Sequence, residues 1–249
     1  DKNVGMYAKL AKNNAAYTTK NTGNITLGNS ASLSNPNVAI YTNASSAGTN
    51  PLENTGNITV GDNAVGMYGY EEDSTGNITV GKDSVGIYKE GTGKVETAAG
   101  KTLTVAEKGY GIYSKGAEVD SKMNLTVNKD AIGVYVENNN LTSNGNVSVG
   151  DKGVGLLVKG AGKTLTSIGN VSVGSNNSVG LYAGEDANIV QNGDVTVADN
   201  DGIGVYSKGN GHITTFGNMT VGKNSIGVYK DGKGTVDIGL ALQTMTIKD

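Results

Sequence analysis

Few residues of the 249-residue chain are suited to acid–base, nucleophilic or metal chemistry. His212 is the only histidine and cysteine is absent, so neither a nucleophile with an adjacent base nor a Cys/His metal site can be assembled. Four aspartates, Asp62, Asp83, Asp151 and Asp199, recur in corresponding turns, which is typical of solvated turn residues and not of two carboxylates facing each other across a sugar. We therefore expect no enzyme, no cofactor and no metal.

Arginine is absent as well, which removes the bidentate group that proteins use on phosphates and guanine edges. Two short motifs resemble ligand-binding loops without completing them. Residues 160–164 read GAGKT, but Leu157 stands where a phosphate-binding loop needs its first glycine. Residues 199–202 read DNDG, but no glutamate follows at the bidentate position of a calcium loop. The net charge of −3 is too small to indicate a polyanionic partner, so we expect no nucleic acid.

The chain is built from degenerate copies of one short repeat. Its first segment reads GNITLG at 23–28, GNITVG at 56–61 and 76–81, GNVSVG at 145–150 and 169–174, and GNMTVG at 217–222, with weaker copies at 101–106, 123–128, 193–198 and 243–248. A second segment follows most copies after a polar turn, VGIY at 85–88 and IGVY at 132–135 for example, and VGMY at 4–7 precedes the first complete copy. Copies are spaced about 20 to 26 residues apart after the longer first ones, which is typical of solenoids.

Each segment has the alternation of a short strand with one buried face. Ile58 and Val60 show it in the first segment, and we expect Val85 and Ile87 to share a buried face in the second. The variable stretch before the next copy predicts a third, looser strand. Three strands per coil predict an all-β, right-handed parallel β-helix of about ten coils, with residues 1–249 forming a single β-helix segment. Disorder is the alternative for so polar a chain, but fixed apolar positions argue against it.

Asparagine follows the glycine in most of the GNIT-like segments. Because it recurs at the same position of the repeat, it predicts a ladder of side-chain amides along the rod. The positions are Asn24, Asn57, Asn77, Asn146, Asn170 and Asn218, with Asp194 in one copy. Asn-Ile-Thr and Asn-Val-Ser also match the N-glycosylation acceptor, but turn and strand chemistry demand the same triplet, and the structural interpretation is preferred. The glycine of the second segment, as in Gly86 and Gly133, predicts a close backbone approach or a bulge.

One position of the repeat predicts a column of aromatic rings along the rod. Its members include Tyr68, Tyr88, Tyr113, Tyr135, Tyr182, Tyr206 and Tyr229, with Leu157 as the exception. Exposed rings at a regular pitch could bind sugars, but a purely structural stack is the preferred interpretation because the position is so uniform.

Departures from the repeat are the candidate partner-binding sites, because solenoids place specificity in loops. The long stretches 29–37 and 42–55, within an irregular region 29–55, contain Pro36 and the pair Asn50 and Pro51. Residues Tyr70, Glu71, Glu72 and Asp73 form an acidic, aromatic tip.

GNITVG followed by DNAVGMY, KDSVGIYKEG or KNSIGVYKDG resembles the passenger repeats of fusobacterial type Va autotransporter adhesins, over nearly the whole chain. The resemblance implies a fragment of a larger passenger domain on the bacterial cell surface, held in the outer membrane by a C-terminal barrel. It implies adhesion to a host surface protein, including immune receptors, to host glycans, or to other bacteria. No apolar stretch is long enough to cross a bilayer. A passive spacer is the alternative function, and a polysaccharide-active enzyme ranks third.

Overall fold

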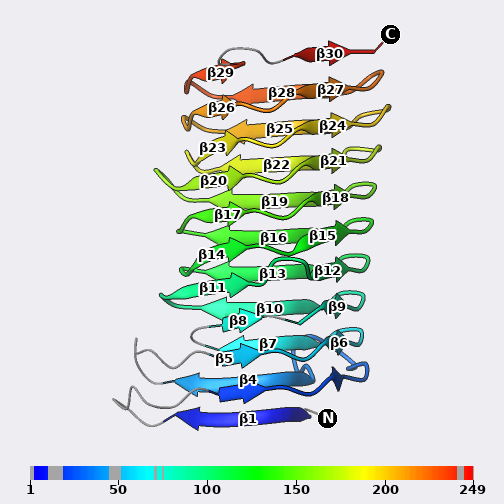
Figure 1. Cartoon of the computed structure of the whole chain (residues 1–249), viewed down its shortest axis with the longest axis vertical. Helices are drawn as coiled ribbons and strands as arrows, with labels where there is room; N and C mark the ends of the chain where they lie inside the picture. Colours follow the sequence, from blue (N-terminus) through cyan, green and yellow to red (C-terminus); the bar gives the residue numbers. More distant parts are fainter. Residues whose placement is uncertain are drawn as a thin grey trace.

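The computed structural model describes residues 3–10, 19–44, 52–69, 72–74, 76–239 and 244–248. Over these residues the protein is all-β and contains no helix. Its strands form three parallel sheets of ten strands each. Successive coils stack along one axis and give a rod (Figure 1). Each coil adds one strand to every sheet, so the predicted parallel β-helix with three strands per coil is confirmed.

The first sheet, here the tyrosine sheet, is formed by the second segment of each repeat. Its strands are β1 Val4–Leu10, β4 Val38–Ala44, β7 Val65–Gly69, β10 Val85–Glu90, β13 Tyr110–Lys115, β16 Ile132–Glu137, β19 Val154–Lys159, β22 Val179–Gly184, β25 Ile203–Lys208 and β28 Ile226–Asp231. Aligned residues lie 20 positions apart between β7 and β10, and 25 apart between β10 and β13. The coil from β1 to β4 is longer, with Val4 paired to Val38.

The second sheet, here the variable sheet, is formed by the predicted third strand. Its strands are β2 Thr19–Asn21, β5 Leu52–Asn54, β8 Glu72–Ser74, β11 Lys94–Thr97, β14 Glu118–Ser121, β17 Leu141–Ser143, β20 Thr164–Ser167, β23 Asn188–Gln191, β26 Ile213–Thr215 and β29 Val236–Ile238. Two predicted insertions are therefore shorter than expected. Residues 42–44 continue β4, Leu52–Asn54 is β5, and Glu72–Ser74 is β8 instead of a loop tip.

The third sheet, here the asparagine sheet, is formed by the GNIT segments. Its strands are β3 Ile25–Thr26, β6 Ile58–Val60, β9 Ile78–Val80, β12 Thr102–Val105, β15 Asn124–Val127, β18 Val147–Val149, β21 Val171–Val173, β24 Val195–Val197, β27 Met219–Val221 and β30 Met245–Ile247. Ile58 and Val60 are buried and Thr59 is exposed, as the alternation predicts. The apolar core runs through the rod between the three sheets.

The predicted asparagine ladder is present. Asn57 Oδ1 accepts the backbone N–H of Asn77 at 3.0 Å, and Asn146 Oδ1 accepts that of Asn170 at 3.0 Å. The ladder is interrupted at Thr102, because a threonine side chain has no carbonyl oxygen to accept the N–H of the next coil. There the N–H of Asn124 is bonded to the Lys101 carbonyl at 2.9 Å instead.

One expectation about the second segment is wrong: Val85 and Ile87 do not share a buried face. Ile87 belongs to the main core, whereas Val85 packs in a separate cluster with tyrosines on the outside of the tyrosine sheet. Gly86 lies between them. A Cβ on Gly86 would come within 2.8 Å of Val80 Cγ2 and 2.5 Å of the Gly111 carbonyl oxygen, so its inward side is already filled by the core. Gly86 and Ile87 both face the core, which breaks the alternation of the strand. Val85, the residue before them, therefore faces outward.

Candidate functional site: an apolar groove beside the tyrosine column

The predicted aromatic column is present on the outer face of the tyrosine sheet. Tyr41 and Tyr68 stack with ring centroids 5.0 Å apart, and Tyr113 and Tyr135 stack at 5.0 Å with their planes 1° apart. The column changes orientation between Tyr88 and Tyr113, whose rings meet edge to face at 66°. Leu157 interrupts it, and Tyr182, Tyr206 and Tyr229 continue it as a tilted stack.

The stacking bears on the idea that these rings bind sugars. A sugar packs against the face of an aromatic ring, but over most of this column the ring faces lie against the next ring along the rod. At the Leu157 interruption, the Nζ of Lys159 lies 5.6 Å from the ring centroid of Tyr135. Ring edges and hydroxyls are therefore what the column presents to solvent, and the structural role of the stack is the better interpretation.

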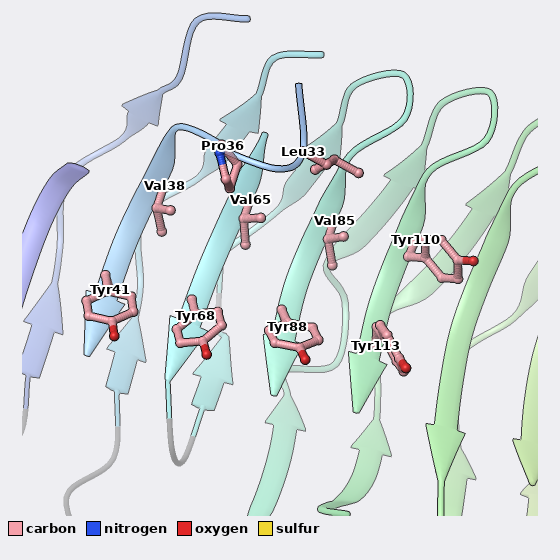
Figure 2. A pocket seen from close by; sticks show the side chains of 10 residues that line it. All are labelled: Leu33, Pro36, Val38, Tyr41, Val65, Tyr68, Val85, Tyr88, Tyr110 and Tyr113. Carbon is pink, nitrogen blue, oxygen red and sulfur yellow. The ribbon is translucent and has the colours of Figure 1, made fainter. Parts of the chain in front are cut away.

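A groove of about 510 Å³ lies beside the column on the same face. Val38, Val65 and Val85 form its floor in successive coils, with 4%, 7% and 9% of their surfaces exposed. In Figure 2 the valines form a row between two walls. One wall is the row Tyr41, Tyr68 and Tyr88, and the other is the segment carrying Leu33 and Pro36.

The groove ends where the repeat changes by one residue. Tyr110 stands at the position of Val85 in the next coil and stacks on Tyr113 with centroids 5.7 Å apart. The bulky ring fills the space that a valine leaves open in the three preceding coils. The first long insertion and the YGIY variant at 110–113 thus define the groove, which the uniform repeat alone would not form.

The Pro36 wall is held in place by Asn37, which is buried. Its backbone N–H donates to Ser30 Oγ at 2.7 Å. Its Nδ2 donates to the carbonyl oxygens of Gly28 at 3.3 Å and Asn29 at 3.1 Å. These bonds close the segment on itself and fix the position of Leu33, which remains 43% exposed at the rim.

The residues that line the groove are uncharged. Carboxylates lie near the tyrosine hydroxyls: Glu137 accepts a hydrogen bond from Tyr113 at 3.1 Å and another from Tyr135. Burial, followed by the charge of Glu137 and this hydrogen bond, raises the pKa of Tyr113 to about 12. Burial and the charges of Glu90 and Glu137 raise the pKa of Tyr88. The hydroxyls of Tyr88 and Tyr113 therefore stay neutral at physiological pH, and the uncharged lining suits an apolar occupant.

These pKa shifts predict alkaline instability. A raised pKa favours the neutral phenol in the folded state, so the stabilisation is complete below the unfolded pKa near 10 and is lost as the pH rises towards about 12. Tyr113→Phe keeps the ring stacking but removes this titration. Denaturant unfolding of both proteins at pH 9 and pH 11.5 should show a smaller loss of stability in the variant. Equal losses would contradict the assignment.

The groove contains only some of the predicted site residues. Pro36 lines it, as do Tyr68, Tyr88 and Tyr113 from the column. Glu72 and Asp73 lie in β8 of the variable sheet, outside the groove. Tyr70, Glu71, Asn50 and Pro51 lie outside the described residues. Sequence reasoning missed Leu33, Tyr110 and the floor valines. The glycine after Val65 and Val85 was the available signal for an outward side chain, whereas Ala39 follows Val38.

The other candidate groups have structural contacts. Asp62 Oδ1 accepts the N–H of Lys82 at 2.8 Å, and Asp199 Oδ1 accepts that of Lys223 at 2.8 Å, so these turn aspartates extend the ladder between coils. His212 Nδ1 lies 2.6 Å from Thr235 Oγ1 on the surface. Among the described residues, no cluster of His, Cys, Asp or Glu could hold a metal ion. No helix in the described part of the chain is long and apolar enough to cross a membrane.

Fold and site together define a parallel β-helix repeat protein with an apolar groove on one side. Comparison with known protein families, curated proteins and solved structures finds no match to the chain.

Proposed function

We propose that the chain is an adhesive segment of a bacterial cell-surface protein that binds an apolar surface of a partner protein in the groove of the tyrosine sheet. The observation that carries this proposal is the groove itself. It is a preformed concavity of about 510 Å³, within the size range of ligand sites, and its exposed walls are aliphatic and aromatic. A monomeric protein rarely leaves such a patch open to water unless something binds there.

The resemblance of the repeats to fusobacterial autotransporter passengers supports the location and partner class. In that setting the rod is exposed outside the outer membrane, and the partner is a protein on a host cell, such as an immune receptor, or on another bacterium. The apolar lining favours a protein over a glycan, because in the groove wall Tyr41, Tyr68 and Tyr88 stack on one another and cover most of the ring faces that would hold a sugar. Many such rods on one cell would add their weak contacts by avidity.

A passive spacer is the second candidate function. From β16 to β28 the coils have nearly uniform length, and the asparagine ladder and the three sheets continue through them. That regularity would suffice to hold a distal binding region away from the cell. The spacer role does not explain the groove between β4 and β13. We expect no enzymatic activity, because the groove lining contains no carboxylate, histidine or lysine.

Direct binding of the purified chain separates the two functions. We expect saturable binding of fluorescently labelled chain to cultured epithelial cells or to other bacteria, competed by unlabelled chain. Heat-denatured chain is the matched control. If a longer form of the protein binds these cells and this chain neither binds nor competes, the adhesive role is contradicted for this segment and the spacer is supported.

A further inference from the structure

The outer face of the asparagine sheet carries two rows of polar side chains, one of asparagines and one of threonines and serines. Apart from the hydrogen bonds of the ladder, no role has been assigned to them. Seven copies have asparagine followed two residues later by threonine or serine, at Asn24, Asn57, Asn77, Asn124, Asn146, Asn170 and Asn218. The residue between them is Ile, Leu, Val or Met, and never proline. In β15 the pattern is plain: Asn124 and Thr126 are exposed and Leu125 is buried. The strand geometry thus presents the amide and the hydroxyl together on one solvent-facing surface.

The fold uses only one of the two polar atoms of each amide. Asn124 Oδ1 accepts the N–H of Asn146 at 2.9 Å, and Asn170 Oδ1 accepts that of Asp194 at 2.9 Å. No hydrogen bond among the described residues uses the Nδ2 atoms of the seven asparagines. Asp194 shows that the ladder needs the oxygen alone, because its Oδ1 accepts the N–H of Asn218 at 2.8 Å. The amide nitrogen is therefore free for another role.

The threonines and serines form the second row, and the fold does not use their hydroxyls for side-chain hydrogen bonds among the described residues. A threonine or serine occupies this position in all ten copies: Thr26, Thr59, Thr79, Thr104, Thr126, Ser148, Ser172, Thr196, Thr220 and Thr246. Within the described part of the chain these hydroxyls make no side-chain hydrogen bond, although a valine would serve an exposed strand position as well. A shallow hollow of about 350 Å³ spans Asn124, Asn146 and Asn170, so the face is open to a bulky group.

We propose that asparagines of this face are sites of N-linked glycosylation. The triplet Asn-x-Thr/Ser is the acceptor for this modification. The amide Nδ2 forms a bond to C1 of a sugar supplied by an activated glycosyl diphosphate donor. The bond from C1 to the donor oxygen breaks, the diphosphate leaves with its electron pair, and the nitrogen loses one proton. Acceptors in adjacent coils are only about 4.8 Å apart along the rod, so neighbouring sugars there crowd one another and occupancy is incomplete.

Peptide mapping tests this directly on the protein purified from the cells that naturally produce it. Trypsin releases residues 123–129, MNLTVNK, which contain Asn124 and also Asn128, an asparagine outside any acceptor triplet. Electron-transfer fragmentation should place a sugar mass on Asn124 and none on Asn128. Unmodified asparagine at all seven positions would overturn the proposal.

The chain contains a control for the role of the surface itself. Asn176-Asn177-Ser178 is also an acceptor triplet, but Asn176 Nδ2 donates to Asp151 at 2.8 Å and Ser178 is buried. We expect Asn176 to be unmodified, and occupancy there equal to that of Asn124 would refute the assignment to this face. Thr126→Val, expressed in the producing cells, should abolish modification of Asn124 alone and leave the circular dichroism spectrum unchanged. Retained modification at Asn124 would count against the proposal.

Discussion

Replacing Val65 with lysine is expected to lower the affinity of the chain for the proposed cell-surface partner at least about tenfold, or roughly 1.4 kcal/mol. Val65 lies in the middle of the groove floor between Val38 and Val85. A lysine there fills part of the groove, and any partner that still docks must bury an ammonium group without a counter-charge. Binding of labelled chain to cells over a concentration series measures the change.

The matched control is Val154→Lys. Val154 has the same position in the repeat, in β19, but lies outside the groove. It should bind as the unmodified chain does, and thermal unfolding should confirm that both variants remain folded. If Val65→Lys binds as well as Val154→Lys, the groove is not the binding site, and the proposed adhesive mechanism fails even if the chain itself adheres.

Gly133→Ala should have the largest effect on stability, a loss of about 3 kcal/mol. A Cβ at this position would lie 2.5 Å from the Gly155 carbonyl oxygen and 2.7 Å from Val127 Cγ2. The oxygen belongs to the backbone of the next coil, and the methyl group to the core, so neither can move freely. Overpacking of this kind typically costs 1–3 kcal/mol or more.

Gly28→Ala provides the comparison, because nothing lies within 4 Å of the added Cβ. Unfolding in denaturant, followed by circular dichroism, should separate the two variants. Hydrogen exchange adds spatial detail, since repeat proteins can unfold in parts. Amides of β16 and β19 should lose protection in Gly133→Ala before those of distant coils. Equal stability of the two variants would show that the coils can separate to accept a methyl group.

The parts of the fold that repeat were predictable, because the copies together show which residue type each position of the repeat requires. Alternation in GNITVG fixed the face of Ile58 and Val60, and recurrence of asparagine predicted hydrogen bonds that the structure contains at Asn57 and Asn146. A period of 20 to 25 residues then left room for only three short strands per coil.

The groove was not predictable in the same way. Pattern reasoning assigned Val85 to the core because it lies two residues from Ile87, and a single inward glycine reverses that assignment. Leu33 lines the same groove as Val85 and Tyr110, which belong to later coils, and no local pattern shows this. The charged tip at 70–73 illustrates the opposite error: its composition indicated a loop, whereas pairing of the backbone with neighbouring coils places Glu72 in a strand.

The hydrogen bonds between coils also determine how the rod would respond to tension. Because they point along its axis, a pull from end to end loads one interface between coils after another, and the weakest interface opens first. Each coil released from the central region frees 20 to 25 residues, enough to lengthen the chain by about 70 to 90 Å at full extension. If a cell were tethered through such a rod in flowing liquid, successive coils would unfold under the load. The lengthening of the chain would limit the force on the bound end.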